Sequence, residues 1–346
     1  MEFLLSNNPI IQSHVHTKSI QNYFNGLVND ATNFNIATGY ITNDSIAALK
    51  QIVEFRQGEM SLSLFIGMHY IEGFTELQYK AISDLSSYLK INNIGEIFLS
   101  QKALFHGKLY SFMRESKCLA SFVGSSNLGS FVGTSQNNIE ADLMFKEDKG
   151  KEINSYIKQI TDSLGINLSD LPTITKFRPS DIKILSGYTH VKEVSKDCLD
   201  SLLRSTTGQV VDIPLKTEAK SNLNTYFGKG KIKGKYSPRG WYEVEIILGK
   251  NLENRSLIPT KDDGSFTVVT TDGYEFQCST QGDYSKNFRS DFDLKILGRW
   301  IKGQMENAGA LEIGKPVTEE TLEKFGKRTL RLEKTNSGVF ILSLEP

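Results

Sequence analysis

The chain has 346 residues, enough for two domains that each bury a core of their own. Hydrophobic residues make up 39% of the chain and charged residues 23%, which is ordinary for a globular protein and excludes a disordered or fibrous one. The 40 lysines and arginines balance the 40 aspartates and glutamates, so the net charge is zero and a uniformly basic chain is excluded, although a local basic patch is not.

The sequence carries no signal for a membrane, a secretory route or a bound cofactor. No apolar run reaches the length of a membrane span, and the first residues lack a basic region followed by an apolar core. Cys118, Cys198 and Cys278 lie far apart and predict neither a disulfide framework nor a zinc site. We therefore expect a cytoplasmic protein with no membrane partner, no metal and no other cofactor.

The first half of the chain alternates between helical and strand-like patterns. Apolar residues at helical spacing predict helices over 18–30, 43–55, 75–89 and 151–164, and apolar runs predict strands over 34–41, 61–70 and 96–100. Strands that alternate with helices are typical of an α/β sandwich built on a mixed sheet. We assign this domain to residues 1–175.

Three further strand-like segments bring chemically useful residues together. His106 and Lys108 stand two apart in the first segment, so a strand would point both side chains to one face. The second segment leads into Gly124-Ser125-Ser126-Asn127, where glycine permits a sharp turn and the serine and asparagine side chains can donate to an anion. The third carries Glu140. We expect these groups to converge, and the set suits attack on a phosphodiester without a metal.

In this region the chain resembles the phospholipase D superfamily, whose mark is His-x-Lys, then Gly-Ser-x-Asn, then a downstream acid. The catalytic residues that the resemblance implies are His106, Lys108, Ser125, Asn127 and Glu140. The superfamily usually has an aspartate five residues after the lysine, where this chain has Met113. Restriction endonucleases of the NgoFVII and BfiI kind, which belong to the superfamily, also lack that aspartate.

The second half of the chain has a different pattern. Residues 176–205 resemble a linker interrupted by proline, and short strands separated by glycines follow. We expect these strands over 210–215, 241–248, 265–270, 274–278, 294–297 and 339–344, with Asp272-Gly273 as a hairpin turn. Such a pattern predicts an all-β domain, a small barrel over residues 206–346.

Two basic arms of this second domain, 222–241 and 282–303, predict a contact with duplex DNA. Basic side chains neutralise phosphates, and arginine or lysine can reach guanine edges in the major groove. We expect Trp241 and Trp300 to lie mostly in the core. The predicted DNA-binding residues are Lys229, Lys231, Lys233, Lys235, Arg239, Lys286, Asn287, Arg289, Lys295 and Arg299.

The segment 286–297 is similar to the same region of the B3-like DNA-recognition domain in NgoFVII-type enzymes. The combined resemblance implies a type II restriction endonuclease that hydrolyses double-stranded DNA without metal. It implies a homodimer in which His106 of one subunit forms a phosphohistidine and His106 of the other serves as acid and base. Lys108, Asn127 and Ser125 would hold the phosphate oxygens, and Glu140 would orient an imidazole. A cognate DNA methyltransferase is implied as well, with room for a partner translocase.

Two other functions stay open. A phospholipase or other phosphodiesterase on small substrates would use the same site but gains nothing from basic arms. A non-catalytic DNA-binding regulator would not need the complete His-Lys-Asn-Glu set. A magnesium site formed by Glu140 and Asp142 is a further alternative. His14 and His16 have no further ligands nearby in sequence, and His69, on an apolar strand, is expected in the core.

Overall fold

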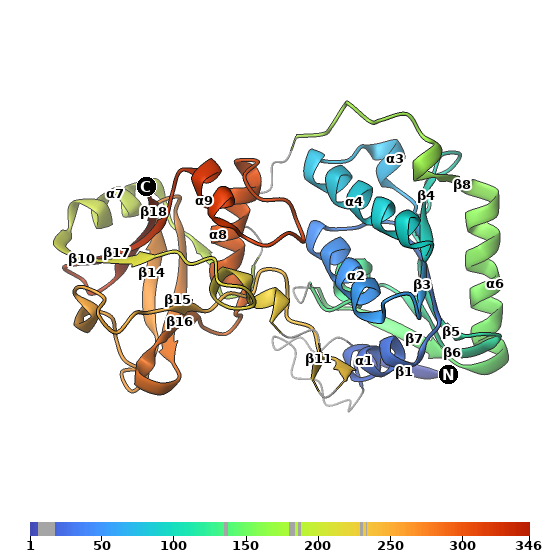
Figure 1. Cartoon of the computed structure of the whole chain (residues 1–346), viewed down its shortest axis with the longest axis horizontal. Coiled ribbons are helices and arrows are strands. Elements are labelled where there is room, and N and C mark those ends of the chain that lie inside the picture. The colour runs from blue at the N-terminus through green and yellow to red at the C-terminus, as the bar shows by residue number, and fades with distance from the viewer. Residues whose placement is uncertain (6–17, 135–137, 180–183, 186–187, 229–230, 233) are drawn as a thin grey trace. The chain divides into compact units, whose positions relative to one another are not determined.

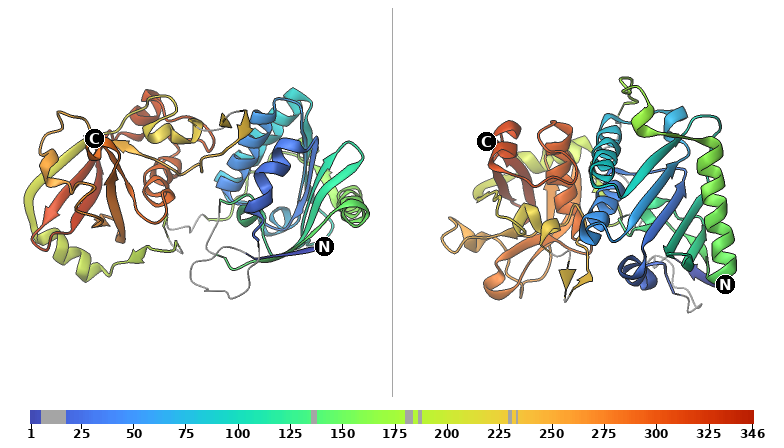
Figure 2. Two further views of the ribbon diagram at one scale, coloured as in Figure 1. Left: turned by 90° about the horizontal axis from the view of Figure 1, so that it is seen from below. Right: turned by 45° about the vertical axis from the view of Figure 1, so that its right-hand side comes forward.

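The computed structural model describes residues 1–346 except 6–17, 135–137, 180–183, 186–187, 229–230 and 233. The chain folds into two compact units, drawn in Figures 1 and 2. The N-terminal unit contains residues 1–180 together with residues 230–238, and the C-terminal unit contains residues 181–229 and 239–346. The chain therefore returns to the N-terminal unit for one short segment, a path that a single linker does not predict. His14 and His16 lie outside the described residues.

An eight-stranded mixed sheet forms the centre of the N-terminal unit, in the order β1-β7-β6-β5-β2-β3-β4-β8. Three neighbouring strands, β2 to β4, run parallel, and the remaining pairs are antiparallel. The strands are β1 (Glu2–Leu5), β2 (Asn33–Thr38), β3 (Ser61–Ile66), β4 (Gly95–Ser100), β5 (Lys108–Arg114), β6 (Lys117–Gly124), β7 (Ala141–Phe145) and β8 (Gly165–Asn167). This sheet confirms the α/β prediction.

Helices cover both faces of this sheet. Figure 1 shows α6 on one face and the helices α1, α2 and α4 on the other. The helices are α1 (Gln21–Asp30), α2 (Asn43–Arg56), α3 (His69–Glu72), α4 (Glu76–Asn92), α5 (Leu128–Phe131) and α6 (Glu147–Leu164), followed by the short 3-10 helix η1 (Leu168–Asp170). Thr42 and Thr75 start α2 and α4 with capping boxes, in which the cap side chain accepts a backbone N–H and the third residue bonds back.

The strand expected over 61–70 is too long, because β3 ends at Ile66. The next residue, Gly67, lies against the backbone of Phe105, where a Cβ atom would come within 1.9 Å of the carbonyl oxygen. The chain then turns into α3, and His69 is 1% exposed and accepts a hydrogen bond from the backbone of Ile41 at 3.1 Å. This burial confirms the prediction of a core histidine, and it lowers the pKa of His69 to about 4.

The segment 230–238 contacts α1 and α2 through one aromatic residue, Tyr236. It contains a two-stranded hairpin, β11 (Lys231–Ile232) and β12 (Lys235–Tyr236). Tyr236 is 3% exposed, packs on Phe55 with 5.2 Å between ring centroids, and donates its backbone N–H to Asn29 Oδ1 at 3.0 Å. Its hydroxyl donates to Gln51 Oε1 at 3.4 Å. Tyr236 is therefore part of the N-terminal core, although the sequence suggested an exposed basic arm.

A second, curled sheet forms the C-terminal unit, in the order β10-β17-β18-β14-β15-β16-β13, with β9 paired to β15 (Figure 1). Its neighbours are antiparallel except β14 and β18. The strands are β9 (Lys192–Glu193), β10 (Thr206–Pro214), β13 (Ile246–Ile247), β14 (Phe266–Thr270), β15 (Tyr274–Gln281), β16 (Asn287–Ser290), β17 (Thr329–Thr335) and β18 (Phe340–Glu345). The predicted turn at Asp272-Gly273 is confirmed, with Gly273 at a φ of 87°.

The strand expected over 294–297 is wrong, because these residues enter a helix. Ile296, Leu297, Trp300 and Ile301 are fully buried, a spacing that places them on one face of a helix. The helical segments of this unit are α7 (Lys196–Arg204), α8 (Lys295–Asn307) and α9 (Glu319–Phe325), with 3-10 turns η2 (Asn222–Phe227), η3 (Arg255–Leu257) and η4 (Asp283–Ser285).

A buried charged network joins α8 to the core of the C-terminal unit. Glu306 is 2% exposed and accepts hydrogen bonds from Trp241 Nε1 at 2.8 Å and Tyr242 Oη at 3.0 Å. Arg299 Nη1 lies 3.9 Å from its carboxylate, and Lys302 donates to the Trp241 carbonyl at 2.7 Å. Burial lowers the pKa of Lys302 to about 7 and raises the pKa of Glu306. Trp241 and Trp300 are core residues, as predicted.

Candidate functional site

The five predicted catalytic side chains line one pocket of about 690 Å³ at the edge of the N-terminal sheet. They meet because β5, β6 and β7 are antiparallel neighbours, so that the start of β5 lies beside the end of β6 and the start of β7. The lining residues are His106, Gly107, Lys108, Leu109, Val123, Gly124, Ser125, Asn127, Asn138, Ile139 and Glu140. The structure thus brings the whole motif set together.

His106 does not lie on a strand, which corrects the sequence prediction. Strand β5 begins at Lys108, which pairs with Thr38, the last residue of β2, and one further backbone hydrogen bond joins Gly39 N–H to the Gly107 oxygen at 3.0 Å. His106 is exposed on the preceding loop, and its imidazole meets the ring of Tyr40 edge to face at 5.4 Å. The two motif residues still share the pocket, which Gly107 between them also lines.

Lys108 is held at the floor of the pocket. The residue is 9% exposed, and its Nζ donates to the backbone oxygen of His106 at 2.7 Å. Burial lowers the pKa of Lys108, and the nearby charge of Glu140 opposes that shift. A partly buried ammonium beside an exposed imidazole is suited to hold an anionic group where the imidazole can reach it.

Glu140 immediately precedes β7 rather than lying within it. Its carboxylate accepts hydrogen bonds from the hydroxyls of Ser125 and Ser130, the latter at 3.1 Å. Ser125 Oγ also accepts from the backbone N–H of Ala141 at 3.0 Å. Glu140 is therefore tied to the Gly-Ser-Ser-Asn turn, and among the described residues no group of three or more His, Cys, Asp or Glu side chains could hold a metal ion.

Asn127 ends the turn and begins α5. Its backbone oxygen accepts from Phe131 at 2.9 Å, as expected for a residue at a helix start. Its side-chain Oδ1 is buried and has no hydrogen-bond partner within the described part of the chain. The Asn127 amide is therefore a polar group of the pocket that can still form a hydrogen bond, through Oδ1, to something other than the described residues.

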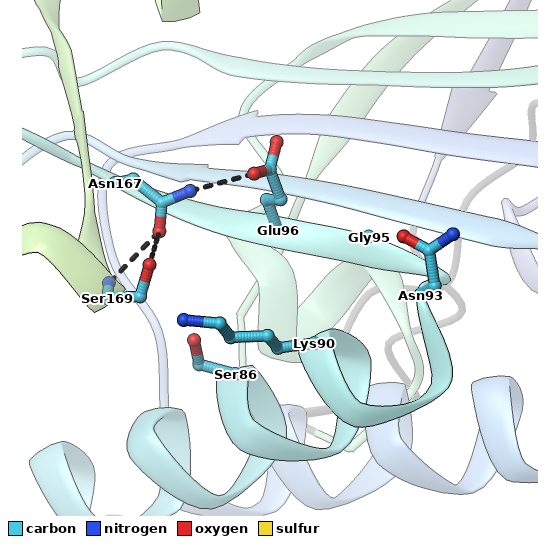
Figure 3. Close-up of a pocket in the computed structure, with 7 residues that line it drawn as sticks. All are labelled: Ser86, Lys90, Asn93, Gly95, Glu96, Asn167 and Ser169. Atoms are coloured by element: carbon cyan, nitrogen blue, oxygen red, sulfur yellow. Dashed lines mark hydrogen bonds between the residues drawn. The ribbon is translucent and has the colours of Figure 1, made fainter.

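A smaller hollow of about 260 Å³ lies at the other end of the parallel strands, beside Gly95 at the start of β4 (Figure 3). Asn167 donates to Glu96 at 2.9 Å and accepts from the Ser169 hydroxyl, also at 2.9 Å. These bonds connect Asn167, at the end of β8, to Glu96 on β4 and to Ser169 in η1.

Arg239 and Arg289, two of the predicted DNA-binding residues, lie close together in the C-terminal unit. Arg239 pairs with Glu243 and lies 3.6 Å from Glu245. Arg289 lies 4.0 Å from Glu245 and shares a strand face with Asn287 on β16. Glu245, which the sequence prediction missed, therefore lies within ion-pair distance of both guanidinium groups.

The other predicted DNA-binding residues are scattered. Lys286 and Lys235 are exposed, but Lys235 belongs to the hairpin of the N-terminal unit. Lys229 and Lys233 lie outside the described residues, and the Lys231 side chain is not described. Lys295 is 9% exposed, and Arg299 donates to the Ile184 carbonyl at 3.1 Å and to Tyr242. Both residues pack in or against α8, so the structure gives them a structural role and not an exposed position for binding DNA.

Comparison with known families agrees with both folds. A model of the NgoFVII restriction endonuclease N-terminal PLD domain matches residues 18–173. A model of the NgoFVII C-terminal B3-like DNA-binding domain matches residues 202–336. A phospholipase D-like domain joined to a B3-like DNA-binding domain defines a DNA-cleaving enzyme that carries its own DNA-binding module. More particularly, the chain belongs to the NgoFVII family of restriction endonucleases.

Solved structures resemble parts of the chain at low identity. Nuc from Salmonella typhimurium, a phospholipase D family member, is 14% identical with a TM-score of 0.31, over 48% of this chain and 96% of that chain. Phosphatidylserine synthase of Haemophilus influenzae Rd KW20 is 10% identical with a TM-score of 0.35, over 48% and 39%. TrmBL2, an archaeal chromatin protein, is 11% identical with a TM-score of 0.29. The match covers 47% of this chain, and it spans about half of the TrmBL2 chain, 53%.

No curated protein matches the chain. None of the helices in the described part of the chain is long and apolar enough to cross a membrane.

Proposed function

We propose that the chain is a sequence-specific endonuclease that hydrolyses DNA without a metal, through a covalent phosphohistidine at a site shared by two subunits. The observation that supports this most is the pocket in which His106, Lys108, Asn127 and Glu140 converge. An imidazole, a partly buried ammonium and an amide are the groups that an anionic phosphodiester needs for in-line attack by nitrogen.

In the first step, an imidazole nitrogen of His106 attacks phosphorus, a P–N bond forms and one bridging P–O bond breaks. The leaving oxygen takes a proton from His106 of the second subunit. In the second step that imidazole removes a proton from water, the resulting hydroxide attacks phosphorus, and the P–N bond breaks. Proton transfer of this kind contributes roughly 10²–10⁴-fold to a rate.

Lys108 and Asn127 would hold the non-bridging oxygens through both steps. Lys108 is suited to this because the Glu140 carboxylate favours its charged form. Its burial also leaves less water to compete with the phosphate for the ammonium group. Ser125, bonded to Glu140, would lie beside the same oxygens. Orienting an imidazole stays a second proposed role for Glu140.

The need for a second subunit follows from counting histidines. Double displacement requires two imidazoles in different protonation states, one as nucleophile and one as acid. The sequence has three His-x-Lys patterns, at 16/18, 106/108 and 190/192. Among the described residues, His106 is the one histidine that lines the pocket with Ser125 and Asn127. Two copies related by a two-fold axis would bring the two motifs into one site. The histidines would then titrate as a pair, with apparent pKa values that belong to both.

Cleavage is expected to continue in excess EDTA, by a species with the mass of a dimer. Plasmid digestion with chelator, combined with light scattering on the same sample, measures both properties. Activity that EDTA abolishes and magnesium restores would disprove the metal-free mechanism. A fully active monomer would remove the shared site but not the phosphohistidine.

For DNA recognition we propose that Arg239, Asn287 and Arg289 contact base edges, because they lie together and two of them share Glu245. A guanidinium held in place by a carboxylate loses little freedom when it meets guanine. Lys286 and Lys235, which are exposed, would contact phosphates. A cognate methyltransferase and a partner translocase stay predictions.

Replacing Arg289 with alanine is expected to reduce discrimination between sequences. One bidentate contact to a base contributes about 1–3 kcal/mol, so affinity should fall on the specific duplex and change little on random DNA. The matched variant is Lys286→Ala, which should weaken both complexes alike and lower the salt slope by about 0.9. The specific sequence is first obtained by mapping the cleaved ends of a plasmid. Equal losses for Arg289→Ala on both duplexes would show that Arg289 reads no base.

A further inference from the structure

Ser126 is the one residue of the Gly-Ser-Ser-Asn turn that faces the protein interior. Its neighbours Ser125 and Asn127 line the catalytic pocket, while Ser126 is 2% exposed. Three of its atoms are bonded. The backbone N–H and the hydroxyl both donate to Asp142, at 3.2 and 2.6 Å, and the carbonyl oxygen accepts from Tyr110 Oη at 2.7 Å. The middle of the turn is therefore fastened on both sides.

Asp142 lies on β7 and pairs directly with Gly124, the last residue of β6. It is 4% exposed, and its carboxylate uses one oxygen for the Ser126 backbone and the other for the Ser126 hydroxyl. A Cβ atom on Gly124 would come within 2.0 Å of Asp142 Oδ1, so glycine leaves the space that the carboxylate fills. Burial raises the pKa of Asp142, and the two bonds from Ser126 oppose that shift.

Tyr110, which contacts the other side of the turn, is itself packed in the core. It is 1% exposed and stacks on Phe131 with 3.6 Å between ring centroids. Phe131 belongs to α5, the helix that begins right after Asn127. The turn is thus enclosed between the carboxylate of Asp142 and a stacked aromatic pair, and neither contact uses a group that the proposed chemistry needs.

We propose that Asp142 is a positioning residue for the nuclease reaction, and that it sets the place of Asn127 and Ser125 by gripping Ser126 between them. The proposal rests on the proposed function, because it assumes that these two side chains hold the phosphate. Asn127 presents an amide whose Oδ1 has no partner in the described structure, so its place is defined by the backbone that carries it. A misplacement of about 1 Å in such a group can cost roughly 10²-fold in rate.

The geometry argues against two other roles for Asp142. As a magnesium ligand it would need free oxygens beside Glu140, yet the Asp142 oxygens face Ser126 and Glu140 faces the hydroxyls of Ser125 and Ser130. As a general base it would need to reach the substrate, and it is not among the described residues that line the pocket. The carboxylate therefore acts on the turn and not on the DNA.

Asp142→Ala is expected to lower the single-turnover cleavage rate about 100-fold while the Kd for specific DNA stays within a few-fold. Asp142→Asn should recover most of that rate, because its amide can accept from the Ser126 N–H and donate to the Ser126 hydroxyl in the same shape. The matched control is Asp148→Ala, a highly exposed aspartate at the start of α6. Rates are compared at a temperature where melting curves show each variant folded, and Ser126→Ala, expected to slow cleavage about tenfold, replaces Asp142→Ala if that variant does not fold.

A double-mutant cycle with Asn127 separates positioning from general stability. If Asp142 acts through the turn, the combined rate loss of Asp142→Ala with Asn127→Ala should be clearly smaller than the product of the two single losses, because part of the Asp142 effect passes through Asn127. A rate loss of the double variant equal to the product of the two single losses would overturn the positioning role. Parent-like cleavage by Asp142→Ala would overturn it as well. His106→Ala is assayed in parallel: cleavage by that variant would reject the proposed function itself, whereas an inactive His106→Ala beside an unaffected Asp142→Ala rejects only the inference.

Discussion

His106→Ala is expected to bind its DNA sequence like the parent and to cut none of it. In the proposed mechanism the substitution removes both the nucleophile of one subunit and the acid of the other, so we expect a loss of at least about 10⁴-fold. His106 is exposed at the pocket rim, and its ring meets only the edge of Tyr40 among the described aromatic contacts. Truncation should therefore leave the fold intact.

Plasmid cleavage and gel shift on the mapped duplex measure the two effects separately. The matched control is Lys102→Ala, an exposed residue of the same loop, which should cut at the parent rate. A burst of covalent protein–DNA complex, trapped by an alkaline quench because phosphohistidine is labile in acid, should appear in the parent and not in His106→Ala. Comparable cleavage by both proteins would show that the motif has been misread.

Glu306→Gln is expected to reduce the free energy of unfolding of the C-terminal unit by about 3–5 kcal/mol. Glutamine keeps the shape but cannot accept from both Trp241 and Tyr242, and it leaves the charge of Arg299 without its carboxylate. The cost is large because the site is almost completely buried, at 2% exposure for Glu306.

Urea denaturation followed by tryptophan fluorescence is a direct measurement of this effect. The sequence has two tryptophans, and both Trp241 and Trp300 belong to the C-terminal unit. Glu312→Gln, a change of the same chemistry at an exposed position, should shift the midpoint little. A shift for Glu306→Gln no larger than that of Glu312→Gln would mean that the network contributes no net stability.

The arrangement of the candidate catalytic pocket could be predicted because it depends on the order of the motif residues along the chain. Motif residues placed at the ends of three successive antiparallel strands must meet at one edge of the sheet. The exact end of a strand depends on its partner instead. His106 lies outside β5, whose pairing with β2 ends at Thr38, and nothing near His106 in sequence reports where β2 stops.

The roles of charged residues were harder to predict. Arg299, Lys295 and Lys302 look like a basic stripe, yet they lie on a buried helix. Arg299 and Lys302 pack against Tyr242 and Trp241, which are about 60 residues away in sequence. Asp142 was considered only as a metal ligand with Glu140, although its position two residues after Glu140 and opposite Gly124 was the available signal of a contact with the turn.

The path of residues 230–238 has a consequence for the engineering of new specificities. A chimera spliced at one point within 181–205 would exchange the recognition domain and, with it, a piece of the nuclease core. Its foreign hairpin would have to present an aromatic ring that fits Phe55, Asn29 and Gln51 as Tyr236 does. Grafts that keep the native hairpin need three splice points, and they preserve the contacts of Tyr236 with Phe55, Asn29 and Gln51 whatever recognition domain is attached.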